Sequence, residues 1–365
     1  MLVNTSLVSN TSVDCLVQFW AERYVPDLSI LSSTEDDLIV SELVDAASGA
    51  GRKKTAIKLR RLLQINCEYA AIMTNMLFSY IPNIVNLTEA KQISQMTLQV
   101  YEKAIEIYEQ QSIPKVLLEE TLQTAASKSL TGGKDFSKDD FTECITSAIK
   151  QLARSLEPLL LQLQEQHQLA HDQSLIGFLS TQFHFTAQSL LNRLNLSEQV
   201  LLSPYFKFLE EQICIPWQRV CSAAAKYEMD SPVLALVQQM LPVSHKIAQS
   251  VYRQAAQLYP THRSRRGKLA HPGVAASTIR DLEMFQSYLW LCVLEKNIAV
   301  VEQELMPLCV MVFPNVDVTW ELVRQMLQLL VNEVKAHLQP NQLPLLQPYT
   351  RAMQQLFFNL ETKVA

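Results

Sequence analysis

Glycine is scarce in this chain, with 7 in 365 residues, whereas an average protein contains roughly 7%. The scarcity excludes glycine-rich phosphate-binding loops, collagen and most architectures built on tight β-hairpins, because each of these depends on glycine. The 7 cysteines are scattered and no pair has zinc-finger spacing. We therefore expect reduced, buried thiols and no metal site.

The chain also lacks the run of about 20 apolar residues that a membrane span requires. Its most apolar stretch, 285–301, is interrupted by Glu295 and Lys296, and Met1–Val13 has no signal-peptide pattern. The formal net charge of −5 provides no general attraction to nucleic acid or to anionic lipid. These observations predict a cytoplasmic protein with no transmembrane segment and no nucleic-acid partner.

Recognisable catalytic motifs are missing as well. No nucleophile elbow, phosphate-binding loop, paired-carboxylate motif or Ser-His-Asp order is present. His167 and His171 have the i, i+4 spacing that can hold a metal, but no further ligands accompany them, so we interpret them as a solvated helix end. The sequence predicts that the protein is not an enzyme and has no catalytic residues.

What the chain does have is helical periodicity. Apolar residues make up 48% and charged residues 18%, which is enough to form a buried core. Apolar positions step by three and four along 93–107, 320–334 and 346–360. No alternating strand pattern and no repeat of 20–50 residues stands out. The prediction is an all-α protein, with a polar break at 196–204 separating a helical domain of unknown family (1–195) from a second helical domain (203–365).

Two basic clusters stand out along the chain. The first, Arg52–Arg61, has no interleaved aromatic residues, so we interpret it as a solvated helix face, with protein docking as the second interpretation. The apolar residues expected on the opposite, buried face are Ile57, Leu59, Leu62 and Leu63. The second cluster, His262–Lys268, follows Tyr259-Pro260 and precedes Arg280-Asp281.

The order of features around the second cluster resembles the phycobiliproteins, the globin-like light-harvesting subunits of cyanobacterial and red-algal phycobilisomes. A helix containing Ile247–Tyr252 leads into Tyr259-Pro260, and Arg280-Asp281-Leu282 is followed by aromatic residues at 285 and 288. Phe313–Trp320 and a closing helix over 349–360 complete the similarity. The resemblance covers about 203–360 and implies a globin-like fold for the second domain.

One departure from the family affects function directly. Family members attach a linear tetrapyrrole through a cysteine two residues before the Arg-Asp pair, and this chain has Thr278 there. A hydroxyl cannot form the thioether, so we expect no covalent bilin and no resident cofactor. The resemblance also implies that Asp281 contacts pyrrole nitrogens and that Arg280 holds a propionate. If the protein handles a tetrapyrrole, Arg263 and Arg266 would join Arg280 and Asp281 in binding the two propionates. Either a non-covalent bilin or a purely structural role would explain the retention of Arg280 and Asp281.

The resemblance further implies a surface for association. The first helices of family subunits pair with a second subunit, and the matching stretch here is Pro204–Lys226. Its apolar residues could pair with another copy as a homodimer or with a different protein, or they could fold back onto the core of the same chain. These residues are Phe206, Leu209, Ile213, Trp217 and Val220.

Three functions remain open from the sequence. The leading hypothesis is a non-catalytic phycobiliprotein-like protein without covalent chromophore, which binds phycobiliproteins or a regulatory protein in phycobilisome assembly, turnover or regulation, in the cytoplasm or at the thylakoid surface. The first alternative is a bilin carrier, chaperone or lyase-like factor, in which arginines bind the propionates through charge-assisted hydrogen bonds. The second alternative is a helical signalling adaptor unrelated to pigment, because fold alone does not determine function.

Overall fold

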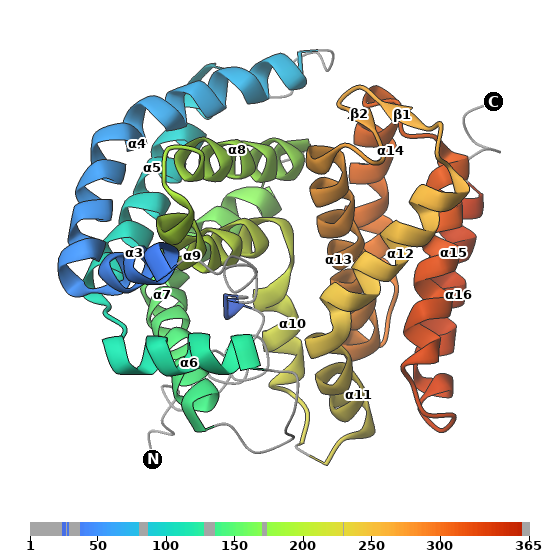
Figure 1. Ribbon diagram of the computed structural model, residues 1–365. Coiled ribbons are helices and arrows are strands. Elements are labelled where there is room, and N and C mark those ends of the chain that lie inside the picture. Colours follow the sequence, from blue (N-terminus) through green and yellow to red (C-terminus); the bar gives the residue numbers. More distant parts are fainter. Residues whose placement is uncertain are drawn as a thin grey trace, which may run out of the picture. The chain divides into compact units, whose positions relative to one another are not determined.

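The computed structural model describes residues 24–26, 28, 37–79, 87–127, 136–169, 174–228 and 230–359. These residues form an all-α protein, as predicted, in which the described strands make only one two-stranded hairpin (Figure 1). The chain divides into two compact units. The N-terminal unit takes the described residues of Leu16–Ala170 and Phe178–Ile213, and the C-terminal unit is built mainly on Cys214–Ala365.

In the N-terminal unit, long helices pack along one another. The helix α4 lies against α5, which in turn lies against α7, while α3 contacts both α4 and α6. Aromatic side chains fill the core: the ring of Tyr101 lies 5.6 Å from that of Phe183 and 4.9 Å from that of Phe206. The helices are α3 (Asp37–Ala47), α4 (Gly49–Leu77), α5 (Leu87–Gln110), α6 (Lys115–Ser127), α7 (Phe136–Leu169), α8 (Ser174–Leu191) and α9 (Leu196–Cys214).

The first basic cluster differs from our prediction at two positions. Arg52 is completely buried, with its guanidinium 4.6 Å from the centre of the Tyr108 ring, whereas Ile57 is 41% exposed. Leu59 and Leu63 are buried as expected. Arg52 precedes these leucines by seven and eleven residues, or two and three helical turns, so it shares their buried face. The periodicity of α4, rather than residue type, decides which side chains face inward.

The C-terminal unit is organised around one buried helix, α13. Every residue of 282–294 is buried, and α13 contacts α10, α11, α12 and α16. Most residues of this segment are apolar, and a helix that is buried on all sides is expected at the centre of a helical domain. The elements are α10 (Trp217–Ala224), α11 (Pro232–Met240), η2 (Leu241–Val243), α12 (Ser244–Leu258), β1 (Arg263–Ser264), β2 (Gly267–Lys268), α13 (Pro272–Glu295), η3 (Val301–Leu305), α14 (Met306–Asn315), α15 (Trp320–Ala336) and α16 (Leu343–Phe358).

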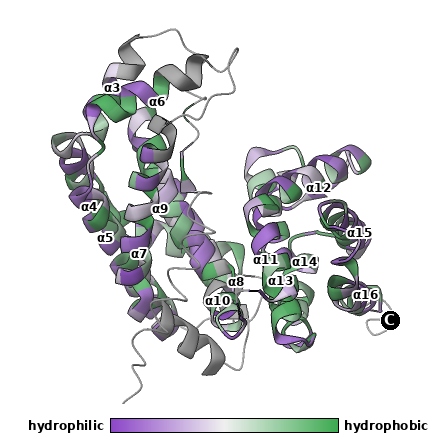
Figure 2. Cartoon of the chain, turned by 90° about the horizontal axis from the view of Figure 1, so that it is seen from below, coloured by the Kyte–Doolittle hydropathy of each residue, from purple (hydrophilic) through white to green (hydrophobic). Residues whose placement is uncertain are grey.

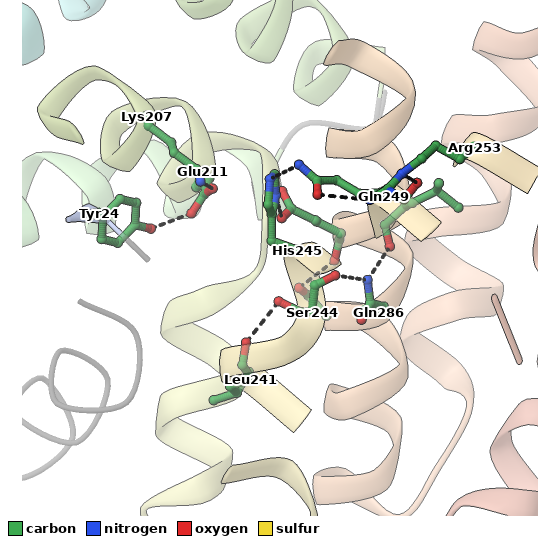
Figure 3. A network of polar contacts seen from close by, with 12 residues as sticks. Tyr24, Lys207, Glu211, Leu241, Ser244, His245, Gln249, Arg253 and Gln286 are labelled. Carbon is green, nitrogen blue, oxygen red and sulfur yellow. Dashed lines mark hydrogen bonds and ion pairs between the residues drawn. The ribbon is translucent and has the colours of Figure 1, made fainter. Parts of the chain in front are cut away.

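Polar side chains connect α12 to α13 (Figure 3). The amide of Gln286 donates to the carbonyl oxygen of Ser244 at 2.9 Å. His245 lies with Nδ1 2.7 Å from the Glu283 carboxylate and Nε2 2.9 Å from the Gln249 amide nitrogen. A neutral imidazole with its proton on Nδ1 satisfies both contacts, because it donates to the carboxylate and accepts from the amide. This network fixes how α12 lies on the central helix.

The break expected at 196–204 lies inside a helix. Pro204 falls within α9, which runs without interruption from Leu196 to Cys214. Proline removes one backbone donor from a helix, but the residues that follow it, Tyr205 and Phe206, are fully buried, and their packing holds the helix together. The division between the units comes later, after Ile213.

Candidate functional site

The hairpin β1–β2 positions the second basic cluster. Arg263 pairs with Lys268 across the two strands. Gly267 has a φ of 128°, which favours glycine, and a Cβ there would lie 3.3 Å from Cβ of His271. His271 caps the next helix, since its Nδ1 accepts from the backbone N–H of Gly273 at 3.2 Å. The hairpin is therefore packed against the first turn of α13.

Arg266, Arg280 and Asp281 come together beside this turn, and we call them the arginine cluster. The guanidinium of Arg266 lies over Gly273, where an added Cβ would be 3.6 Å from its Nη2. The Arg280 Nη2 lies 3.8 Å from the Asp281 carboxylate. Burial and the nearby charge of Arg280 lower the pKa of Arg266, and Asp281 opposes this shift. Two guanidinium groups and one carboxylate make a site suited to anions.

Arg263 and Thr278 are the other two residues predicted for a bilin site. Arg263 is exposed on β1, and among the described residues no ion pair joins it to the arginine cluster. Thr278 is half-buried on α13, and its hydroxyl donates to the carbonyl oxygen of Val274 at 2.8 Å. The Thr278 hydroxyl is therefore hydrogen-bonded within its own helix.

Arg265, in the turn of the hairpin, belongs to the second basic cluster but is not among the predicted site residues. Its Nε lies 3.5 Å from the carboxylate of Asp317, and its backbone N–H donates to the carbonyl oxygen of Val316 at 3.1 Å. These contacts connect the hairpin to the turn between α14 and α15. A separation of about fifty residues leaves no local pattern from which such a pairing could be read.

The predicted association surface is largely internal. Phe206 and Leu209 are fully buried, and Phe206 stacks edge-on against Tyr101 within the N-terminal unit. Val220 is also buried and Ile213 is half-buried. Phe206 and Leu209 therefore pack into the core of their own chain, which was one of the alternatives, and do not face a partner. Trp217 begins α10, but its side chain lies outside the described part of the chain.

An exposed apolar surface lies elsewhere, on α4. Ile65, Tyr69, Ile72 and Met76 expose 63%, 53%, 60% and 65% of their surfaces, and we call them the α4 stripe. Their spacing of four, three and four residues places them along one face of the helix. Hydrophobic and hydrophilic residues both appear along α4 in Figure 2. The opposite face contains buried polar residues such as Thr74, which obscures the stripe in the sequence.

A basic segment precedes the stripe on the same helix. Lys58 and Arg60 are already held by carboxylates of the same unit, at 3.0 Å from Glu198 and 2.6 Å from Glu109. Arg61, one turn before Ile65, is exposed. At this end the α4 stripe is therefore bordered by the exposed cation Arg61, an arrangement that residue types alone did not predict.

Within the described ranges, no group of three or more His, Cys, Asp or Glu residues could hold a metal ion. His171 and the side chain of His167 lie outside those ranges. A separate search of the described helices finds none with the length and apolar character needed to cross a membrane. Comparison of the chain with protein-family models, curated proteins and solved structures gives no match.

Proposed function

We propose that this chain is a non-catalytic, phycobiliprotein-like protein that acts through protein–protein contacts in phycobilisome assembly, turnover or regulation. The observation that supports the proposal is the α4 stripe, four large apolar side chains that are each more than half exposed. Contiguous exposed apolar patches usually mark interaction sites. The phycobilisome setting comes from the resemblance of residues 203–360.

We also propose that the protein carries no covalently bound chromophore. Thr278 stands where the resemblance requires the thioether cysteine, and its hydroxyl is occupied by the Val274 carbonyl. The nearest cysteine along α13, Cys292, is buried, and burial raises the pKa of its thiol to about 12. A protonated, inaccessible thiol is a poor nucleophile, so it does not replace the missing attachment residue.

The test is a binding measurement with purified phycobiliproteins, whose visible absorption reports the bound fraction. We expect the protein to co-sediment with them, and the double variant Ile65→Glu/Ile72→Glu to lose most of this binding. Val116→Glu is the matched control, because Val116 is 64% exposed on α6 of the same unit. Wild-type protein that binds no phycobiliprotein, or that carries a zinc-fluorescent band on a denaturing gel, would contradict the proposal.

A second candidate function is non-covalent tetrapyrrole binding, which the arginine cluster favours. Burial and the nearby charge of Arg280 lower the pKa of Arg266, and Asp281 offsets them only in part, so a further carboxylate such as a bilin propionate would stabilise the two guanidinium groups. Titration with biliverdin should then shift its visible band, and Arg280→Gln should weaken binding at least tenfold. Arg351→Gln, an exposed arginine on α16 of the same unit, is the control. An unchanged spectrum at saturating bilin excludes this candidate.

A further inference from the structure

We infer that the α4 stripe binds the α4 stripe of a second copy of this chain, with the two helices antiparallel. The inference rests on the proposed function only in treating the stripe as a protein-docking surface. It adds that a second copy covers the stripe when no phycobiliprotein is bound, so that dimerisation and phycobiliprotein binding exclude one another, and it gives the orientation of the two copies. The reasons are the self-complementarity of the stripe, the charge pattern along α4 and the size of the surface.

The stripe is complementary to itself under a two-fold axis. When the axis passes between Tyr69 and Ile72, Ile65 lies opposite Met76 of the second copy and Tyr69 lies opposite Ile72 of the second copy. Every apolar side chain then meets another apolar side chain. Symmetric two-fold pairing of this kind is the commonest arrangement of soluble oligomers.

The charges agree with the antiparallel arrangement. In this register Arg61 lies just beyond the last turn of the other α4, where the helix dipole places partial negative charge. The last turn of α4 has no basic residue of its own, and no charged residue occurs between Phe78 and Leu87. Arg61 of each copy therefore approaches a helix end that lacks a cation. A parallel pair would instead place the two Arg61 side chains together.

The surface is large enough for a weak, specific dimer. A biological interface needs about 1,000 Å² of buried area in total. The two stripes contribute eight side chains that are 53–65% exposed, and the exposed residues Arg61, Gln64, Glu68 and Asn75 border them on the same helix. An area near this lower bound is typical of weak or transient association.

Sedimentation velocity of the full chain tests the association. We expect the mass to rise with concentration from 41.5 kDa to twice that value. Ile72→Glu should weaken self-association at least a hundredfold, because the new carboxylates would be buried near the axis, whereas Val116→Glu should not change it. Arg61→Glu should weaken it roughly tenfold. Lys53→Glu is the matched control, because it makes the same change of charge at an exposed residue on another side of α4.

Disulfide formation tests the orientation. An equimolar mixture of Ile65→Cys and Met76→Cys chains should form a mixed disulfide dimer, while each variant alone should not. In the antiparallel register the two copies of residue 65 are about 16 Å apart along the helix axis, beyond the reach of a disulfide. Efficient linkage of Ile65→Cys chains alone would show parallel pairing and overturn the proposed geometry.

Failure of the dimer and failure of the proposed function give different results. A wild-type chain that stays at 41.5 kDa at all concentrations overturns the dimer. If Ile72→Glu then also lowers the stability of the monomer, the chain itself covers the stripe. If the monomer still binds phycobiliproteins through the stripe, the proposed function stands with a different partner. A dimer that ignores phycobiliproteins overturns the proposed function alone.

Discussion

Arg52 is a cation in the core of the N-terminal unit. Its guanidinium lies over the Tyr108 ring and donates to the Tyr108 carbonyl oxygen at 3.3 Å and to the Tyr205 hydroxyl at 3.4 Å. The long side chain also fills core volume. Its contribution to stability therefore has a packing part and a polar part.

Substitution can separate the two parts. We expect Arg52→Ala to lower the free energy of unfolding by about 3 kcal/mol, because it leaves a cavity. Arg52→Met should cost about 1 kcal/mol, because it restores most of the volume and loses only the polar contacts. Urea unfolding of both variants measures the difference. Equal losses for the two variants would show that packing by the Arg52 stem is unimportant.

The buried cysteine thiols are predicted to resist alkylation in the native protein. Burial raises the pKa of Cys67 and of Cys292 to about 12 and that of Cys309 well above its usual value. At pH 8 their thiolate fraction is negligible, so native protein should leave all three unmodified by iodoacetamide. Half-buried Cys144 should react faster. Peptide mass spectrometry gives the order, and rapid labelling of Cys292 would contradict the assigned packing.

Some of these residues could be identified from sequence and others could not. Arg280 and Asp281 are adjacent in the chain, so their proximity follows directly, and Thr278 is one helical turn after Val274. Arg266 joins them only because Gly267 and His271 pack the hairpin against α13. The position of Arg266 depends on tertiary packing, which cannot be predicted from the spacing of residues along the chain.

At the scale of elements, the π-helical turn η3 directs Glu304 toward Arg219. The guanidinium of Arg219 contacts Glu304 and lies 3.3 Å from Glu295. Burial lowers the pKa of Arg219, but the two carboxylates outweigh it and the net shift is upward. The ion pairs of Arg219 therefore connect α10 to the last residue of α13 and to η3.

A double-mutant cycle measures this connection. About a third of each side chain is exposed, so solvent screening limits the coupling between Arg219→Ala and Glu304→Gln to about 1 kcal/mol. Thermal unfolding at low and high salt provides the values. A coupling of zero at low salt would show that the ion pair does not hold the element in place.

Periodicity predicted the long helices well and their boundaries less well. The apolar steps along 93–107 and 320–334 correspond to α5 and α15, whose inward positions are buried. Pro204 suggested a break because proline disfavours helix interiors, yet packing keeps α9 continuous. The α4 stripe escaped notice because exposed and buried apolar residues look alike in sequence.

At the scale of the whole molecule, buried acidic groups predict alkaline instability. In the folded state the pKa values of Tyr108, Cys67 and Cys292 are all about 12, whereas unfolded tyrosine and cysteine titrate near 10 and 8.5. Between those values the unfolded chain releases protons that the native state retains, so raising the pH favours unfolding.

We therefore expect these three groups to leave the stability unchanged below about pH 8 and to lower it above pH 9, by up to about 1.4 kcal/mol per pH unit for each titrating group. Urea titrations at several pH values measure the slope. Tyr108→Phe should reduce the slope above pH 10 because it removes one group. If the dependence of stability on pH above pH 10 is the same in the Tyr108→Phe variant as in the wild type, the Tyr108 phenol is not buried.

Site-specific photocrosslinking can determine whether another polypeptide covers the α4 stripe. A benzoylphenylalanine would replace Ile72 in one variant and Val116 in the other, and both would be irradiated in the cell of origin. We predict that position 72 gives a discrete product containing a second polypeptide, identified by mass spectrometry as this chain or a phycobilisome component, and that position 116 gives none. Crosslinks at position 72 that stay within a single chain, or equal products at both positions, would contradict the proposal that another polypeptide covers the stripe.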